Sequence, residues 1–256
     1  MQDRNFDDLA DKFSQNIYGT RKGLVRQAIL WDELEALLPS LPAGPLAVLD
    51  AGGGVGQISS GLAARGHQVT LCDLSAEMLK LAADHARETG VSHNMRFRQV
   101  SAQQVGEHLD TPVDLVLFHA VLEWVADPLA VLQALWQTLK PGGVLSLMFY
   151  NAHGLTFRTL TLGNFGYLRA NMTKRKKRTL SPDFPREPQD VYQWLTQCGF
   201  VIEQRTGVRV FSDYMKPQPG AGKSVEEIIE MERRYCRQEP FLSLGRYIHV
   251  TARKPR

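Results

Sequence analysis

The stretch "DAGGGVG", from Asp50 to Gly56, combines an acidic group with closely spaced glycines. Glycines allow a tight turn and let a ligand approach the backbone closely. The spacing differs from the G-x-G-x-x-G pattern of dinucleotide-binding proteins. Counted from Gly52 or Gly54, the third glycine position is occupied by Gln57 or Ser59. The loop therefore indicates a ligand site, but it fits a pyrophosphate-binding dehydrogenase poorly.

A second acidic residue, Asp73, ends the apolar run "QVTLCD". An acidic side chain at the end of the second strand can accept hydrogen bonds from both ribose hydroxyls of a nucleoside. Alternatively, Asp73 is an acid at a helix start near Ser75, where it would interact favourably with the helix dipole. The glycine loop and Asp73, taken together in this order, favour a nucleoside cofactor.

The elements that would position these residues alternate between short apolar runs and helix-like segments. The expected strands are "LAVLD", "QVTLCD", "MRFRQV", "VDLVLFH" and "VLSLMFY". Helices are expected from about 22 to 38, from Ser75 to about 89, and from Asp127–Pro128 to the breaker "LKPGG" at 139–143. This alternation predicts an α/β fold with a doubly wound, mostly parallel sheet.

After Tyr150 the pattern changes to a long polar and basic insertion. Alternation then resumes with a helix at 188–198, a strand in "FVIEQRTGVRVF", and a helix after the capping-box spacing of Ser224 and Glu227. We therefore divide the chain into four parts. These are an N-terminal helical segment (1–45), a cofactor-binding half (46–150), the basic insertion (151–187), and a C-terminal half that completes the sheet (188–256).

Composition and cysteine usage narrow the class of protein. A chain of 256 residues with 43% hydrophobic content can bury one sizeable core, and a net charge of +3 names no partner by itself. Cys72, Cys198 and Cys236 form no CxxC pair, so we expect reduced thiols in a cytoplasmic protein and no metal site. The N-terminus lacks the apolar core of a secretory signal, and no run approaches the roughly 18 apolar residues of a membrane span.

These motifs resemble those of the class I S-adenosylmethionine-dependent methyltransferases. "LDAGGGVG" is similar to their first motif, "LCDLS" to the second, "SAQQV" to the third and "VDLVLFHAVLEWV" to the fourth. The resemblance implies a seven-stranded Rossmann-like sheet with an antiparallel last strand, here "RYIHVTA", and S-adenosyl-L-methionine as cofactor. It places one residue of the third motif, Ala102 or Gln103, beside the adenine, and it places His119 near the methionine half. The cofactor-binding residues that it implies are Arg26, Asp50, Gly52, Gly53, Gly54, Asp73, Leu74, Ala102, Gln103 and His119.

Segments outside these motifs resemble the branch of the family that modifies bacterial tRNA. Among them are "NFDDLADKFSQNIYGTRKGLVRQAILW", "KKRTLSPDFPREP" and "RRYCRQEPFLSLGRYIHVTARK". The resemblance implies methyl-esterification of the carboxylate of 5-carboxymethoxyuridine at the wobble position of the tRNA anticodon loop. The product would be 5-methoxycarbonylmethoxyuridine. Two alternatives stay open: a small-molecule O-methyltransferase, and a non-catalytic RNA-binding protein with the same fold.

A carboxylate acceptor changes which residues the chemistry needs. With a pKa of about 4 it is ionised at neutral pH, so methyl transfer needs approach geometry and no general base. His119 is a possible base, but we favour a packed or cofactor-contacting histidine. Arginine matches two carboxylate oxygens with its planar fork. The candidates for substrate or RNA contact are Tyr150, Asn151, Arg209, Arg233, Arg234, Arg237 and Arg246. For Arg233, Arg234 and Arg237 a solvated helix end is an equal alternative.

The basic block lies inside the insertion and consists of Lys174, Arg175, Lys176, Lys177 and Arg178. Such runs are usually solvated segments. This one follows the fifth strand, close to the ligand edge of the sheet, and lysine and arginine supply most of the sequence-independent affinity for RNA phosphates. We therefore expect it to contact the tRNA backbone. Trp124 could stack on a base or belong to the core, and the sequence leaves the oligomeric state open.

Overall fold

The structure is a computed structural model that describes residues 7, 20–170, 172, 182, 184–215 and 222–256. A seven-stranded sheet in the order β3-β2-β1-β4-β5-β7-β6 forms its centre. The strands are β1 (Ala47–Ala51), β2 (Gln68–Asp73), β3 (Met95–Gln99), β4 (Val113–His119), β5 (Leu139–Tyr150), β6 (Val201–Val208) and β7 (Tyr247–Arg253).

The direction of the strands confirms the predicted sheet. Strands β1 to β5 pair in parallel, whereas β7 runs antiparallel to both β5 and β6, between which it lies. Because β1 and β4 are neighbours although two strands separate them in the chain, the strand order reverses beside β1. Ligands of open α/β sheets bind at the carboxyl ends of strands at such a reversal.

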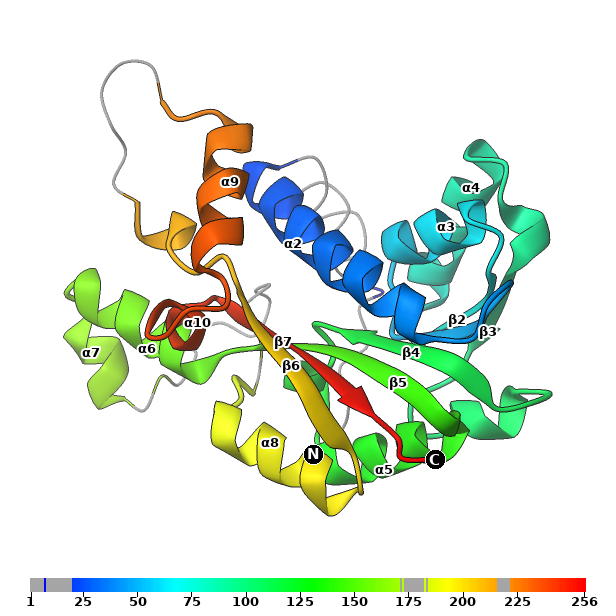
Figure 1. The fold of residues 1–256 in the computed structure, drawn as a ribbon. Helices are drawn as coiled ribbons and strands as arrows, with labels where there is room; N and C mark the ends of the chain where they lie inside the picture. The colour runs from blue at the N-terminus through cyan, green and yellow to red at the C-terminus, as the bar shows by residue number, and fades with distance from the viewer. Residues whose placement is uncertain (1–6, 8–19, 171, 173–181, 183, 216–221) are drawn as a thin grey trace.

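Helices cover both faces of the sheet (Figure 1). On one face lie α2 (Arg21–Leu37), α3 (Gln57–Ala64) and α4 (Ala76–Glu88), and on the other lie α5 (Pro128–Thr138) and α8 (Pro188–Gln197). Helix α9 (Val225–Tyr235) packs against α2, and α10 (Phe241–Leu244) precedes β7. Helices α6 (Ala152–Thr161) and α7 (Phe165–Arg169) follow β5 and begin the predicted insertion. Its basic block, 174–178, lies outside the described residues. Among the described helices, none has both the length and the apolar character that crossing a membrane requires.

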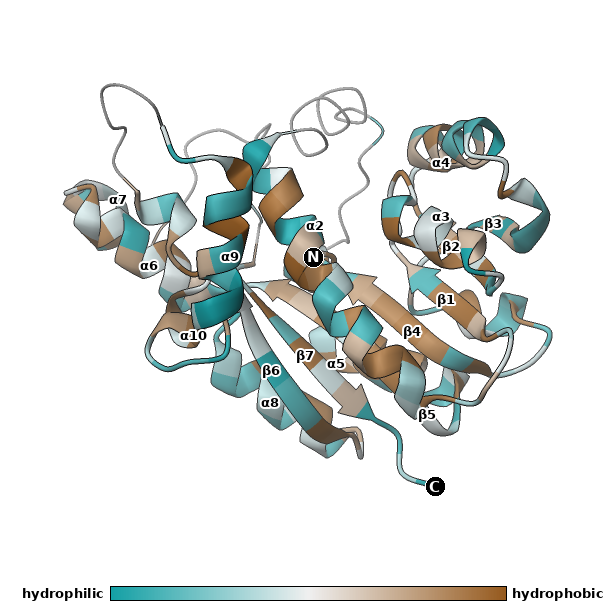
Figure 2. Ribbon diagram, turned by 45° about the horizontal axis from the view of Figure 1, so that its top comes forward, coloured by the Kyte–Doolittle hydropathy of each residue, from teal (hydrophilic) through white to brown (hydrophobic). Residues whose placement is uncertain are grey.

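The core is built on the alternating faces of the central strands. Along β4, Phe118 packs with the α5 and α8 side chains, whereas Leu117 packs with those of α2, α3 and α4. Strands β4 and β5 are accordingly hydrophobic along most of their length (Figure 2). A sheet buried on both faces is held rigidly, and its strand ends can therefore fix the side chains of a site.

The predicted helix starts are confirmed by their caps. Ser75 accepts a hydrogen bond from Met78 N at 3.1 Å, Asp127 accepts one from Ala130 N at 3.0 Å, and Ser224 and Glu227 form a complete capping box. The helix ends at Thr138, directly before the predicted breaker "LKPGG", as expected, and these five residues also begin β5. The pairing of β5 with β4 shifts register between Leu139 and Val144. Pro141, which has no N–H group, therefore lies where the sheet requires no hydrogen bond from it.

Candidate functional site

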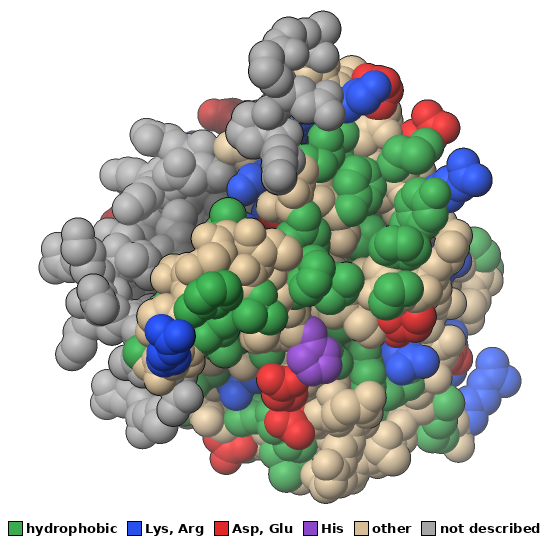
Figure 3. All heavy atoms as spheres, turned by 90° about the vertical axis from the view of Figure 1, so that its left-hand side faces the viewer, with side chains coloured by type: hydrophobic (Ala, Val, Ile, Leu, Met, Phe, Trp, Pro, Cys, Tyr) green, Lys and Arg blue, Asp and Glu red, His purple; other side chains and the backbone are tan. Residues whose placement is uncertain are grey.

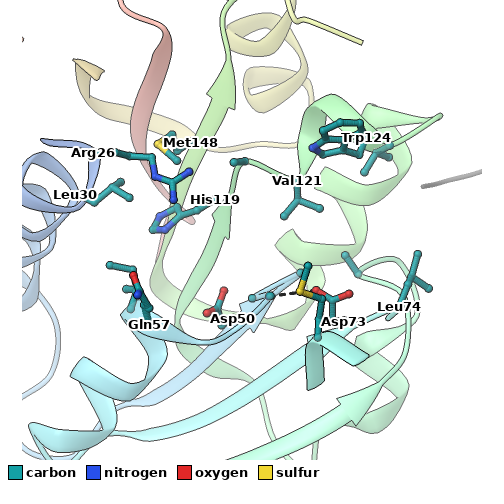
Figure 4. Close-up of a pocket in the computed structure, with 18 of the residues that line it drawn as sticks. Arg26, Leu30, Asp50, Gln57, Asp73, Leu74, His119, Val121, Trp124 and Met148 are labelled. Carbon is teal, nitrogen blue, oxygen red and sulfur yellow. Dashed lines mark hydrogen bonds between the residues drawn. The ribbon is translucent and has the colours of Figure 1, made fainter. Parts of the chain in front are cut away.

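A pocket opens at the carboxyl ends of β1, β2 and β4, beneath α2 (Figure 4). All ten residues predicted to bind the cofactor line it. They come from α2, the glycine loop, the ends of β1, β2 and β4, and the turn that follows β3. No motif indicated most of the other lining residues, which are largely apolar: Gln27, Leu30, Gln57, Ile58, Met78, Val100, Ala120, Val121, Trp124, Val125 and Met148. Val121 and Trp124 lie two and five positions after His119, within the fourth motif, so that motif could have indicated them.

The glycine loop is drawn tightly against the neighbouring strand. The N–H groups of Gly52 and Gly53 both donate to Cys72 O, at 2.7 and 3.2 Å. Gly52 has a φ of 73°, and a Cβ atom there would lie 2.6 Å from a methyl group of Val121. A side chain at this position would be strained and would displace the pocket wall. The glycine therefore keeps the backbone open to a ligand.

Asp73 is oriented by two backbone donors. Its Oδ2 accepts from Gly54 N at 3.1 Å and its Oδ1 from Ser75 N at 2.9 Å. Burial raises the pKa of Asp73, and these hydrogen bonds oppose the rise. Since a carboxylate has about four acceptor positions, Asp73 can still accept hydroxyl groups from a pocket ligand. This geometry suits the ribose role predicted for it.

Asp50 lies buried at the base of the pocket, where its Oδ2 accepts a 2.5 Å hydrogen bond from the Ser59 hydroxyl. Burial raises the pKa of Asp50 to about 7, although the Ser59 bond opposes this. A cationic group bound nearby would lower that pKa again by favouring the ionised form. Asp50 is thus a buried acid whose charge responds to what the pocket holds.

His119 ends β4 and faces the pocket beside Arg26 of α2 (Figure 4). Its Nε2 lies 2.8 Å from Ser146 Oγ. Burial first, and then His249 and Arg26, lower the pKa of His119 well below its usual value. A neutral imidazole with so low a pKa is a weak general base at neutral pH. This favours a ligand-contacting role for His119.

Three of the predicted substrate arginines lie on α9 or just after it, and none of them lines the pocket. Arg233 donates to both carboxylate oxygens of Asp32, at 2.8 and 2.9 Å, and Arg237 donates to Glu33 at 2.7 Å. The Arg234 guanidinium lies over the Tyr235 ring at 5.7 Å. The contacts of Arg233 and Arg237 join α9 and the residues after it to α2, a structural role that the sequence did not indicate.

Asn151 is also occupied by the fold. It is fully buried, and its amide donates to Ser243 O and Gly245 O at 2.9 and 2.8 Å. Its side-chain oxygen accepts from His153 N and caps α6. Asn151 thereby fixes the chain that leaves β5 to the segment that enters β7.

The remaining candidates form a cluster around Asp213, in the short helix η6 (Ser212–Tyr214). Arg246 donates to Asp213 at 2.8 Å and to the Tyr150 hydroxyl at 2.7 Å. Arg209 also donates to Asp213, and Lys22 approaches it to 3.5 Å. Burial opposes ionisation of Asp213, but the arginines outweigh it and lower its pKa to about 2. The Asp213 cluster therefore brings three cations to one carboxylate.

The Asp213 cluster adjoins the pocket along two elements. Lys22 lies one turn before Arg26 on α2, and Tyr150 lies two residues beyond Met148 on β5. Arg209 has a φ of 60°, which is unfavourable for a non-glycine residue, and within the described residues its buried Nε has no hydrogen-bond partner. A strained, incompletely satisfied arginine in a positively charged cluster is suited to binding an anion.

The fold and the pocket define a class I S-adenosylmethionine-dependent methyltransferase. Residues 49–147 match the methyltransferase domain family. The fold resembles that of magnesium protoporphyrin IX methyltransferase from Synechocystis PCC 6803 with bound SAH, with a TM-score of 0.66, 21% identity and coverage of 97% of this chain and 96% of that one. A ubiquinone biosynthesis O-methyltransferase from Xanthomonas axonopodis pv. citri (strain 306) is 34% identical over 65% of this chain and 67% of its own length.

A much nearer relative covers the whole chain. The tRNA 5-carboxymethoxyuridine methyltransferase of Escherichia coli (strain K12) is 61% identical over 255 residues, which is 100% of this chain and 98% of that protein. The chain belongs to the family of tRNA 5-carboxymethoxyuridine methyltransferases.

Proposed function

We propose that this protein methyl-esterifies the carboxylate of 5-carboxymethoxyuridine at the wobble position of tRNA. The observation that carries the proposal is the 61% identity to such an enzyme along the full length of the chain. The pocket supports it, because all ten residues expected at the cofactor line one cavity.

S-adenosylmethionine, when bound, supplies a methyl group made electrophilic by its sulfonium. The pocket residues fit this molecule. Asp73 accepts the ribose hydroxyls, and Ala102 and Gln103 lie where the adenine is expected. Arg26 and His119, side by side near Met148, hold the methionine end (Figure 4). A Cβ atom on Gly53 would lie 2.7 Å from Asp50 and Leu71, so the loop can pack against these two side chains only with glycine there.

The acceptor carboxylate binds at the Asp213 cluster in this proposal. Arg246 offers a guanidinium whose charge is shared with Asp213, and the adjacent Tyr150 hydroxyl can donate. Sharing weakens the hold on the substrate, so the acceptor oxygen keeps its nucleophilicity. Because that oxygen is already ionised, the protein contributes position and needs to remove no proton.

The tRNA lies across the insertion in this proposal, with its anticodon loop at the pocket. Hydrophobic side chains gather on the outer face of α6 and α7 (Figure 3). Leu160, Leu162 and Phe165 are 47%, 63% and 49% exposed there. Exposed apolar and aromatic groups can stack on splayed bases, while the 174–178 block neutralises phosphates. Changing all five basic residues of the block to Gln is expected to weaken tRNA binding and reduce its salt dependence, with cofactor affinity unchanged.

The activity is tested with methyl-labelled S-adenosylmethionine and two tRNA preparations. One carries 5-carboxymethoxyuridine at the wobble position, and the matched control carries unmodified uridine. Label is expected only in the first, as a methyl ester on the wobble nucleoside from which mild alkali releases labelled methanol. Label in both preparations, or only in a small-molecule extract, would contradict the proposal and favour one of the alternatives.

A further inference from the structure

A line of buried polar side chains crosses the sheet from the pocket to α2. His119 Nε2 lies 2.8 Å from Ser146 Oγ, which lies 2.8 Å from His249 Nε2. His249 Nδ1 faces Glu33 Oε2 at 3.8 Å, and Glu33 accepts from Arg237 at 2.7 Å. Ser146, His249 and Glu33 are buried, and none of these three lines the pocket.

The serine hydroxyl restricts how the two histidines can be protonated. It carries one proton and faces two ring nitrogens at hydrogen-bond distance, so it donates to one of them and accepts from the other. Both imidazoles are neutral, because burial lowers the pKa of His119 and brings that of His249 to about 4. Two arrangements are therefore possible, and each assigns one tautomer to each ring.

Glu33 decides between these arrangements. At 3.8 Å it is too far for a hydrogen bond, but its carboxylate lies beside His249 Nδ1 in a space that excludes water. A negative charge there favours an N–H on Nδ1 over a lone pair. His249 Nε2 then accepts from Ser146, and Ser146 accepts from His119 Nε2–H. The lone pair of His119 then lies on Nδ1, the ring nitrogen that does not face Ser146.

We propose that Ser146, His249 and Glu33 are positioning residues that hold His119 as its Nε2–H tautomer, so that Nδ1 offers the pocket a hydrogen-bond acceptor. Arg26, beside it, offers donors (Figure 4). A neutral acceptor next to a guanidinium complements the two ends of a zwitterionic amino acid. His119 accepts from the ammonium group and Arg26 donates to the carboxylate. The inference rests on the proposed function, and it assigns the methionine amino group of the cofactor to His119.

The tautomer is measured directly in the ligand-free wild-type protein. Long-range proton–nitrogen correlation spectra of protein labelled with ¹⁵N at histidine distinguish protonated from unprotonated ring nitrogens, and His119→Gln and His249→Gln assign the signals. We expect an unprotonated Nδ1 in His119 and a protonated Nδ1 in His249 at neutral pH. The opposite pattern would overturn the inference, whatever the outcome of any activity measurement.

The effect of the tautomer on cofactor binding is tested with two cofactor analogues. Ser146→Ala is compared with Ser60→Ala, whose buried hydroxyl donates to Met95 Sδ at 3.7 Å and lies outside the pocket lining. Calorimetry is done with S-adenosylhomocysteine, which has the amino acid end, and with 5′-methylthioadenosine, which lacks it. We expect Ser146→Ala to weaken the first about tenfold and the second less than about twofold, because only the first donates from an ammonium. Ser60→Ala should weaken neither.

Equal weakening of both analogues by Ser146→Ala would mean general damage to the pocket and would overturn the inference. A wild-type protein that binds neither analogue would instead overturn the proposed function, and the tautomer measurement would still decide the protonation of His119.

Discussion

The pocket and the Asp213 cluster each bury a carboxylate, but they shift its pKa in opposite directions. Asp50 has a hydroxyl as partner, and burial raises its pKa to about 7. The Asp213 side chain is also buried, but Arg209, Arg246 and Lys22 lower its pKa to about 2. The pocket is therefore incomplete without a ligand, whereas the cluster is internally paired and contributes surplus positive charge.

The largest effect is expected for Asp73→Ala in the pocket. Losing the acceptor for two ribose hydroxyls should weaken S-adenosylhomocysteine binding about a thousandfold, because hydrogen bonds to a charged group contribute roughly 1.5–3 kcal/mol each. Calorimetry measures it. Asp110→Ala is the control, since Asp110 is exposed and pairs with Arg96 on the surface. A loss below tenfold would leave Asp73 as a helix-start acid, the alternative that its sequence position allowed.

The pH dependence of stability should have opposite signs for the two carboxylates. The unfolded chain loses the Asp50 proton near pH 3.8 and the folded protein near pH 7, so this group lowers stability as pH rises through that window. Asp50→Asn removes the effect. The free energy of unfolding of the variant, relative to that of the wild type, should therefore increase by about 4 kcal/mol between pH 4 and pH 8. Urea denaturation of the two ligand-free proteins at each pH measures this difference. The pKa of Glu123 is also raised to about 7, but its contribution is the same in both proteins and drops out of the comparison.

Asp213→Asn is the matched opposite. The folded pKa of Asp213 lies below the unfolded value, so its ionic stabilisation is present above about pH 4 and is lost as pH falls towards 2. The variant should be about 3 kcal/mol less stable than the wild type, with no change between pH 5 and pH 8. If both variants changed stability in the same direction with pH, the contrast between the two regions would fail.

Arg246→Met tests whether the surplus charge of the Asp213 cluster serves the substrate. We expect kcat/KM for tRNA to fall about a hundredfold, because a charge-assisted contact to the acceptor carboxylate is lost. S-adenosylhomocysteine affinity should stay unchanged. Arg253→Met is the control, since Arg253 lies at the far end of β7, the strand that Arg246 precedes, and pairs with Glu203. An Arg246 variant with normal kcat/KM would assign the Asp213 cluster to stability alone.

The sequence was informative where function is encoded locally. The backbone nearby determines the position of the glycine loop and of the side chains at the strand ends, such as Asp73 and His119. Motifs and strand order therefore predicted that they meet in one pocket. Arg26 lacked a local signal, and only family resemblance indicated it. The arginines depended on partners that no local pattern reveals. Arg233 meets Asp32 across 201 positions, and Ser146 meets His249 across 103.

The smallest effect is expected for Arg233→Ala, and it separates the two interpretations of the α9 arginines. Its ion pair with Asp32 is half exposed, so its loss should cost less than about 1 kcal/mol of stability. Methylation of tRNA should keep its wild-type kcat/KM, because Arg233 lies outside the pocket lining and is turned towards α2. If tRNA affinity instead fell tenfold while stability stayed normal, α9 would belong to the RNA surface. Arg233 would then leave Asp32 to reach a tRNA phosphate. The arginines of α9 would in that case act on the substrate as well as those of the Asp213 cluster.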